Sequence, residues 1–122
     1  YVMGWGRDND FGLIASTEDG IQVAAASYRE YDETDYFSST LDKLFPAPPF
    51  IELAIGIKKG YRGNGLGPFL LTQVAQHAGE AGFPNIYLCV SRNNTHAQHV
   101  YQGVGFRTVY ETSSQKSMVK EL

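Results

Sequence analysis

Apolar and polar positions in the first part of the chain have the pattern of a β-hairpin. Residues 13–17 and 21–31 are rich in Leu, Ile, Val and Ala, and the segment Glu-Asp-Gly at 18–20 separates them. An Asp-Gly pair between two such runs is a common hairpin turn. Residues 32–50 follow, first acidic and aromatic and then rich in proline, with a short helix expected around 39–44. We interpret this stretch as a long connection with a functional role.

The middle of the chain has the pattern strand, glycine-rich loop, helix. Residues 51–57 are mostly apolar and predict a strand, and KKGYRGNGLG follows at 58–67. Apolar residues then recur at helical spacing over 68–81, with Pro68 in the first turn and Gly82 just past the end, as is typical of helix boundaries. The stripe expected to be buried consists of Leu70, Leu71, Val74, Ala75 and Ala78.

The last third predicts a strand, a second helix and two closing strands. Residues 86–90 are a short apolar run, and Asn94 is placed to cap a helix, because its side chain accepts from the first free amides. Residues 106–111 and 117–122 alternate as strands around a Ser-Ser turn. The apolar face of the second helix follows the i, i+3, i+4, i+7 rule through Ala97, Val100, Tyr101 and Val104.

The predicted order is therefore β β (loop) β α β α β β, a mixed α/β (α+β) fold. We expect a mostly antiparallel sheet with one central β-loop-α-β crossover over 51–90, because a parallel pair needs a connection of that length. The 122 residues, of which 43% are hydrophobic and 19% charged, suffice for a single domain with one core.

Charge and composition exclude several classes of function. The net charge of −3 lacks the basic excess that binding to nucleic acid requires. No apolar run approaches the roughly 20 residues of a membrane helix. The single cysteine, Cys89, has no partner for an internal disulfide, and no signal segment precedes the first predicted strand. These features predict a protein of the reducing cytoplasm that binds neither nucleic acid nor a membrane.

Cysteine and histidine positions predict neither a nucleophile nor a metal site. Cys89 lies mid-strand, where a buried and unreactive thiol is the common case, with a covalent route through this thiol as a minor alternative. The three histidines fall on the polar sides of their helices without a second ligand set at metal spacing. They are His77, His96 and His99. We therefore expect no metal.

The glycine-rich loop is the strongest chemical signal in the sequence. Residues 62–67 lie between a predicted strand and a predicted helix, where backbone N–H groups and the helix dipole favour an anion such as phosphate. Lys58 and Lys59 add positive charge. The loop lacks the lysine of a Walker A motif and the spacing of a dinucleotide fingerprint, so ATP and NAD fit poorly. A structural turn that binds nothing is the alternative.

Two motifs in the expected order resemble the GNAT superfamily of N-acetyltransferases. Arg62, Gly65 and Gly67 match its acetyl-coenzyme A signature Gln/Arg-x-x-Gly-x-Gly/Ala. Downstream, Asn94-x-x-Ala97-x-x-Val100-Tyr101-x-x-x-Gly105-Phe106 is similar to the family's Asn-x-x-Ala-x-x-Leu-Tyr-x-x-x-Gly-Phe stretch. The resemblance covers about residues 11–122. Family members usually begin with a strand and one or two helices, and we expect the single domain 1–122 to lack them, because little of that fits before Phe11.

The resemblance implies an acyl-CoA N-acyltransferase fold that uses acetyl-CoA as acyl donor. Backbone amides of the loop would hold the pyrophosphate, pantetheine would run along the strand that ends at residue 57, and amides near 55–57 would polarise the thioester carbonyl. Gly56 suits such a close approach, with packing against a neighbouring side chain as the alternative. The implied cofactor contacts are Ile55, Ile57, Arg62, Gly63, Asn64, Gly65, Leu66, Gly67 and Asn94.

Two residues are candidates for the catalytic steps. Tyr101 matches the tyrosine that protonates the departing thiolate in many members of the family, although its helical position would equally suit core packing. Glu52, on the cofactor strand, is the leading candidate for the general base, with a salt-bridged or solvated strand carboxylate as the alternative reading. Other candidates for the base are the acids of the long connection, Asp32, Glu33 and Asp35.

The resemblance implies an N-acetyltransferase that transfers an acetyl group to a primary amine by direct attack in a ternary complex. The alternatives are a non-catalytic acyl-CoA-binding or regulatory module and, more weakly, an interaction domain without a ligand. The acceptor stays open among peptide N-terminus, lysine, polyamine and amino sugar. The aromatic residues of the long connection are expected to shape its pocket, namely Tyr36, Phe37, Phe45 and Phe50. An exposed sheet edge would also permit a homodimer.

Overall fold

The computed structural model describes residues 2–5, 10–31, 46, 49–63 and 65–122. The predicted short helix around 39–44 lies outside these residues. The elements along the described chain are β1 (Val2–Trp5), β2 (Phe11–Ser16), β3 (Gln22–Tyr31), β4 (Phe50–Ile57), α2 (Leu66–Glu80), β5 (Asn85–Ser91), α3 (Thr95–Gly103), β6 (Arg107–Glu111) and β7 (Gln115–Glu121). The predicted hairpin, crossover unit and closing strands are all present, with boundaries shifted by a few residues.

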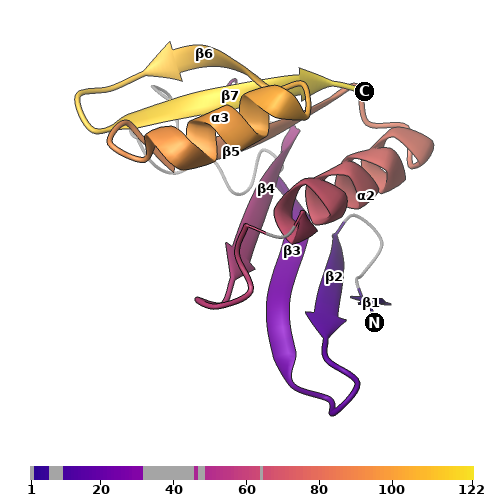
Figure 1. Ribbon diagram of the computed structural model, residues 1–122. Helices are drawn as coiled ribbons and strands as arrows, with labels where there is room; N and C mark the ends of the chain where they lie inside the picture. Colours follow the sequence, from indigo (N-terminus) through magenta and orange to yellow (C-terminus); the bar gives the residue numbers. More distant parts are fainter. Residues whose placement is uncertain (1, 6–9, 32–45, 47–48, 64) are drawn as a thin grey trace.

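The strands form one sheet in the order β1-β2-β3-β4-β5-β7-β6 (Figure 1). All neighbours are antiparallel except β4 and β5, which are parallel and are connected through α2. The prediction of a mixed, mostly antiparallel sheet with a central crossover is therefore confirmed. The β2–β3 turn closes where predicted, with Gly20 at φ +84°, a conformation that glycine adopts without steric cost.

The sequence analysis missed β1, which pairs with β2 from Val2↔Ala15 to Trp5↔Gly12. A run with glycine inside it has low intrinsic strand propensity. The strand exists because the neighbouring edge of β2 offers backbone partners, which is a tertiary effect that local pattern does not reveal.

The pairing between β4 and β5 is short compared with its neighbours. The β3–β4 ladder extends from Ala24↔Ile57 to Tyr31↔Phe50, whereas β4 and β5 share the single pair Glu52↔Tyr87. Beyond that pair the two strands diverge, as Figure 1 shows. The sheet therefore opens in its middle, at the carboxyl end of β4.

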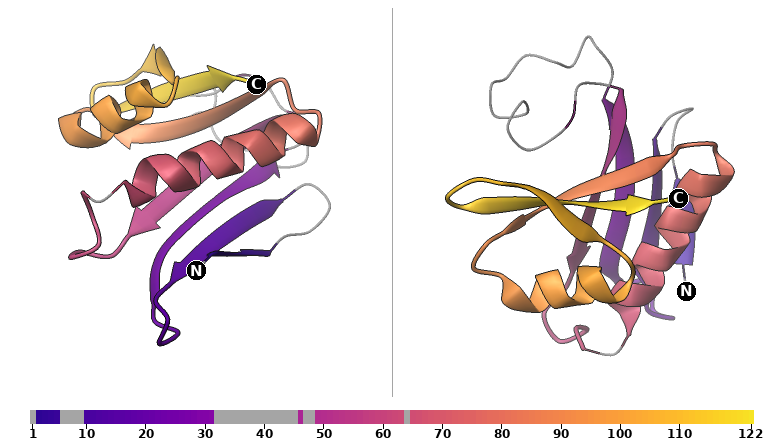
Figure 2. Two further views of the ribbon diagram at one scale, coloured as in Figure 1. Left: turned by 45° about the vertical axis from the view of Figure 1, so that its right-hand side comes forward. Right: turned by 90° about the horizontal axis from the view of Figure 1, so that it is seen from above.

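Both helices lie on one side of the sheet and cover the core (Figure 2). The predicted stripe of α2 is confirmed, because all five of its residues are buried. They pack against alternate residues of the neighbouring strands, including Ile86 and Leu88 of β5 and Met118 of β7. The predicted apolar residues of α3 are partly buried and pack against the same core.

The side of the sheet opposite the helices, here called the far face, carries residues that the sequence analysis placed differently. Since Ile86, Leu88 and Val90 of β5 point inward, Cys89 points to the far face, where it is only half-buried. The prediction of a buried Cys89 was thus wrong. Its Sγ donates to Gln115 Oε1 at 3.3 Å, and burial raises the pKa of its thiol, which agrees with an unreactive group.

His77 also differs from its prediction as a residue on a polar helix side. Its ring stacks on Phe11 with centroids 3.5 Å apart, and its Nδ1 lies 2.9 Å from the hydroxyl of Tyr28. His96 and His99, in contrast, are exposed as predicted. His77 is therefore a packing residue that joins α2 to β2 and β3.

Candidate functional site

The glycine-rich loop leads from β4 into α2 through several residues with left-handed backbone. Gly60, Gly63 and Gly65 have φ of +97°, +80° and +85°, values that L side chains rarely adopt. Gly67 has a different reason to be glycine, because a Cβ there would lie 3.3 Å from Ile57 Cδ1. The loop therefore lies against the end of β4 with its backbone uncovered.

The start of α2 is electrostatically suited to an anion. Its N-cap, Gly65, makes no side-chain hydrogen bond to the helix, and the first turn contains no acidic residue. The positive end of the helix dipole is therefore not offset by a carboxylate of its own first turn. Arg62 lies beside this end, with its Nε donating to the carbonyl of Ile57 at 3.0 Å.

A pocket of about 470 Å³ connects this loop with the opening between β4 and β5. It brings together eight of the residues predicted from the sequence, which are Ile55, Ile57, Arg62, Gly63, Gly65, Gly67, Asn94 and Tyr101. Gly56 lines it too, and no described atom lies within 4 Å of the position of a Cβ there. Among the described residues no side chain packs against Gly56, which argues against its alternative reading as a packing glycine.

Two of the predicted cofactor contacts, Asn64 and Leu66, are not among the described residues that line the pocket. Asn64 lies outside the described residues. The side chain of Leu66 packs against the hydrophobic core and is not among the residues that line the pocket. The sequence analysis assigned no cofactor contact to five further lining residues, which are Pro68, Leu71, His96, Ala97 and Val100. The helical spacing of Leu71, Ala97 and Val100 had indicated only which helix face is buried, whereas Pro68 was interpreted as a helix-boundary residue and His96 as a residue on a polar helix side.

Tyr101 lines the pocket and also packs against the core, so the expected core packing is confirmed and its role as proton donor stays a prediction. Its ring lies 6.2 Å from that of Phe106 in an edge-on arrangement. Burial raises the pKa of its phenol above the usual value, because a phenolate loses hydration there. The hydroxyl is therefore protonated at neutral pH.

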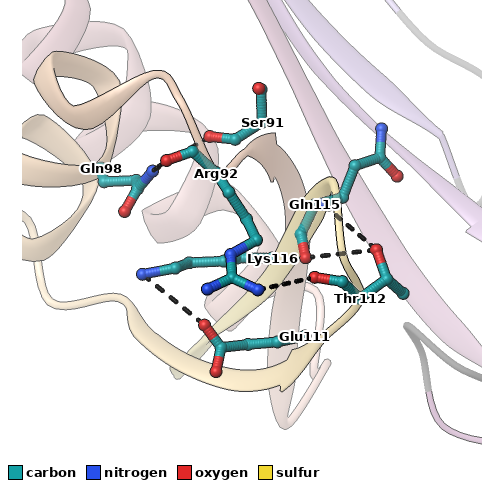
Figure 3. Close-up of polar contacts among 7 residues, drawn as sticks. All are labelled: Ser91, Arg92, Gln98, Glu111, Thr112, Gln115 and Lys116. Atoms are coloured by element: carbon teal, nitrogen blue, oxygen red, sulfur yellow. Dashed lines mark hydrogen bonds and ion pairs between the residues drawn. The ribbon is translucent and has the colours of Figure 1, made fainter.

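A buried glutamine fixes the helix that carries Tyr101, and the sequence analysis missed it. Gln98 Nε2 donates to the carbonyls of Ser91 and Arg92, at 3.0 and 3.1 Å, where β5 ends (Figure 3). Arg92 in turn donates to the Thr112 carbonyl of the β6–β7 turn at 3.1 Å. The sequence feature that could have indicated this role is a polar residue, Gln98, next to Ala97 on the buried side of the predicted helix. Asn94 caps α3 as predicted, accepting from the amide of Ala97 at 3.1 Å.

Glu52 lies on the far face, and it does not line the pocket. It is the β4 member of the single pair with Tyr87, so it marks the place where the strands part. Burial raises the pKa of its carboxyl, while a hydrogen bond with Tyr31 and the charge of Arg29 act in the opposite direction. Arg29 is the cross-strand partner of Glu52 and lies over the Tyr31 ring, 4.9 Å from its centroid.

The other candidates for the general base, Asp32, Glu33 and Asp35, lie outside the described residues. Within the described residues we find no group of three His, Cys, Asp or Glu side chains that could hold a metal ion. In the same part of the chain, no helix has the length and apolar character to cross a membrane.

Comparison with known proteins agrees with this geometry. The profile of the acetyltransferase (GNAT) family matches residues 3–106. The chain belongs to the GNAT family. Spermine/spermidine N(1)-acetyltransferase of Bacillus subtilis (strain 168) is 35% identical to this GNAT chain over 99 residues, which are 78% of the chain and 58% of that protein. The chain thus spans a little over half the length of this relative.

Solved structures confirm the acyl-CoA N-acyltransferase fold. The GNAT domain of S. lividans PAT superposes with a TM-score of 0.76 at 20% identity, covering 93% of this chain and 61% of that one. A GNAT superfamily phosphinothricin acetyltransferase from Sinorhizobium meliloti, in complex with AcCoA, gives a TM-score of 0.71 at 15% identity, covering 94% and 62%.

Proposed function

We propose that the chain transfers an acetyl group from acetyl-CoA to a primary amine by direct attack, and that the amine belongs to a polyamine. The observation that carries the proposal is the pocket of about 470 Å³, which runs from the glycine loop along the part of β4 that has left β5 and reaches Tyr101. The polyamine class is supported by the 35% identical relative, which is named for spermine and spermidine.

The lining of this pocket suits acetyl-CoA in charge, shape and size. The uncovered backbone of the glycine loop and the dipole of α2 favour the pyrophosphate, with Arg62 beside them. The apolar stretch Ile55–Ile57 suits the pantetheine chain, and Gly56 leaves room for it. The volume falls in the range of pockets for small ligands. When bound, acetyl-CoA supplies an activated thioester.

Tyr101 is the proton donor in this proposal. A departing thiolate needs a proton, and Tyr101 presents a protonated phenol to the pocket. Gln98 fixes α3 to the end of β5 and Asn94 caps the first turn of α3, so together they fix the helix that carries this hydroxyl. Backbone N–H groups of β4 near residues 55–57, beyond its last pair with β5, would polarise the carbonyl.

Glu52 is the general base in this proposal. An alkylammonium ion has to lose a proton before it attacks, and a carboxylate whose pKa is raised towards neutrality accepts it more readily. Glu52 has such a pKa shift, and it lies at the start of the opening between β4 and β5. An amine on the far face would thus meet the base before it enters the opening.

The test has two steps on the full chain. Calorimetric titration with acetyl-CoA, with NAD and ATP as comparators, is expected to give binding of acetyl-CoA only. Release of free thiol is then measured with spermidine, lysine, a peptide N-terminus and an amino sugar as acceptors, and spermidine is expected to react fastest. Binding without thiol release from any amine would instead indicate the non-catalytic acyl-CoA-binding module, and absence of binding would contradict the whole proposal.

A further inference from the structure

The start of α3 lines the same pocket as the glycine loop, so the N-termini of both helices meet there. Gly65 and Pro68 line the pocket at the start of α2, and Asn94 and His96 line it at the start of α3. Neither helix has an acidic residue in its first turn. The positive ends of both helix dipoles therefore favour an anion in this pocket.

His96 belongs to the face of α3 that lines this pocket. Residues four apart in a helix lie one above the other on the same face, and Val100, four residues after His96, lines the pocket too. His99 is as exposed as His96, but it does not line the pocket, and neither do Thr95 and Gly103, which share its face. The two histidines therefore differ in location and not in exposure.

The ionisable side chains around His96 are cationic or neutral. Among the described residues that line the pocket, the other ionisable ones are Arg62, from the glycine loop, and Tyr101, from α3 itself. The lining stretches of β4 and α2 contribute none, and the phenol of Tyr101 is uncharged at neutral pH. In the described part of the chain we find no hydrogen bond or ion pair to the His96 ring. Its ring can therefore meet an anionic ligand without competition from a carboxylate of this pocket.

We propose that His96 is a second cationic contact, besides Arg62, for the phosphate groups of acetyl-CoA, and that binding of acetyl-CoA takes up a proton from the solvent at this residue. The inference rests on the proposed function, because it takes acetyl-CoA as the ligand of the pocket. Histidine is the side chain that changes charge between pH 5 and 8, and an anion beside its ring favours the protonated form. By linkage, such a ligand binds more weakly as the pH rises. Arginine stays charged over this range, so Arg62 alone would give no such pH dependence.

The experiment is calorimetric titration of the full chain with acetyl-CoA at about pH 6, 7 and 8, in buffers of different ionisation enthalpy, which report proton uptake. The 3′-phosphate of acetyl-CoA itself titrates near pH 6, as phosphate monoesters do, so variants are compared with one another. His96→Gln is expected to raise the Kd about fivefold at the lowest pH and less than twofold at the highest. Its proton uptake near pH 7 is expected to be lower by about 0.3 proton per ligand. His99→Gln is the matched control and should behave like the unaltered chain.

Two further measurements identify the charge and the phosphate group involved. His96→Arg keeps a positive charge and removes the titration, so it should bind acetyl-CoA about as tightly as the unaltered chain at the lowest pH, without the proton uptake that depends on His96. 3′-Dephospho-CoA lacks the phosphate monoester. A difference between His96→Gln and the unaltered chain that persists with this ligand assigns the contact to the pyrophosphate, and a difference that disappears assigns it to the 3′-phosphate.

The outcomes separate this inference from the proposed function. Equal proton uptake and equal pH dependence of the Kd in His96→Gln and His99→Gln would overturn the inference, even if spermidine is acetylated. Proton uptake that depends on His96, without acetylation of any amine, would support the inference and contradict the proposed transfer alone. Absence of acetyl-CoA binding would contradict both.

Discussion

The two faces of the sheet present their polar groups by different means. On the helix side, the pocket begins at a loop whose glycines expose backbone, and the amides and dipole of α2 are its main polar groups at that end, with Arg62 beside them. On the far face, the polar groups are side chains from different strands, Arg29 and Tyr31 of β3 and Glu52 of β4. A backbone site is encoded in one contiguous segment, whereas a side-chain site depends on strand register. A backbone site is therefore easier to find from sequence, and a side-chain site is easier to change by substitution.

The largest expected effect concerns the helix side. Tyr101→Phe is expected to lower kcat by about 100- to 10,000-fold, the usual contribution of a positioned general acid, because the phenylalanine ring keeps the packing and removes only the hydroxyl. Stopped assays of thiol release measure kcat, and calorimetry measures acetyl-CoA affinity, which should stay within about twofold. Tyr110→Phe is the control, since Tyr110 is an exposed residue of β6. Equal losses in kcat and affinity would contradict the role of proton donor.

A second prediction separates backbone strain from ligand contact. Gly65 and Gly20 have φ of +85° and +84°, and neither has a described atom within 4 Å of a Cβ position. Gly65→Ala and Gly20→Ala should therefore both lower the free energy of unfolding by about 1–2 kcal/mol. Only Gly65→Ala should weaken acetyl-CoA binding, by about tenfold for one lost charge-assisted hydrogen bond. Thermal unfolding and calorimetry measure the two effects, and equal affinities in both variants would argue against the loop as the phosphate site.

The smallest expected effect concerns the far face. Because the charge of Arg29 lowers the pKa of Glu52, Arg29→Gln should raise that pKa. A base acts when deprotonated, so the acid limb of the kcat/KM profile should move to higher pH, by less than about one unit for an exposed arginine. Arg29→Lys should restore the original limb. The pH profile of kcat/KM measured with spermidine checks this prediction. If the acid limb does not move in Arg29→Gln, the charge of Arg29 does not affect the pKa of the base.

Sequence patterns revealed most of the fold and the helix side of the site. The spacing of Leu70, Leu71, Val74 and their neighbours predicted which face of α2 is buried, because helical periodicity is a local property. The glycine-rich loop could be recognised for the same reason, because its glycines lie in one contiguous segment. Gln98 was missed because its partners, the carbonyls of Ser91 and Arg92, are backbone atoms at the end of another element.

The surroundings of Glu52 could not be derived from local pattern. Its position on β4 was predicted, but Arg29 and Tyr31 reach it only through the antiparallel register of β3 and β4, and a one-residue slip would have placed them on the other face. No periodicity within one segment reports such a register.

The single pair between β4 and β5 also has a consequence for local unfolding. It divides the ladder into two antiparallel blocks, β1–β4 and β5-β7-β6, which are otherwise connected through α2. Cooperative units that open separately are often supersecondary motifs of this kind. Because one strand pair joins the blocks, opening along the seam between them is expected, and amide hydrogen exchange would detect it. The pocket at the glycine loop is lined from both sides of this seam, by β4 and by α3, so a ligand that fills it would protect the two blocks from exchange together.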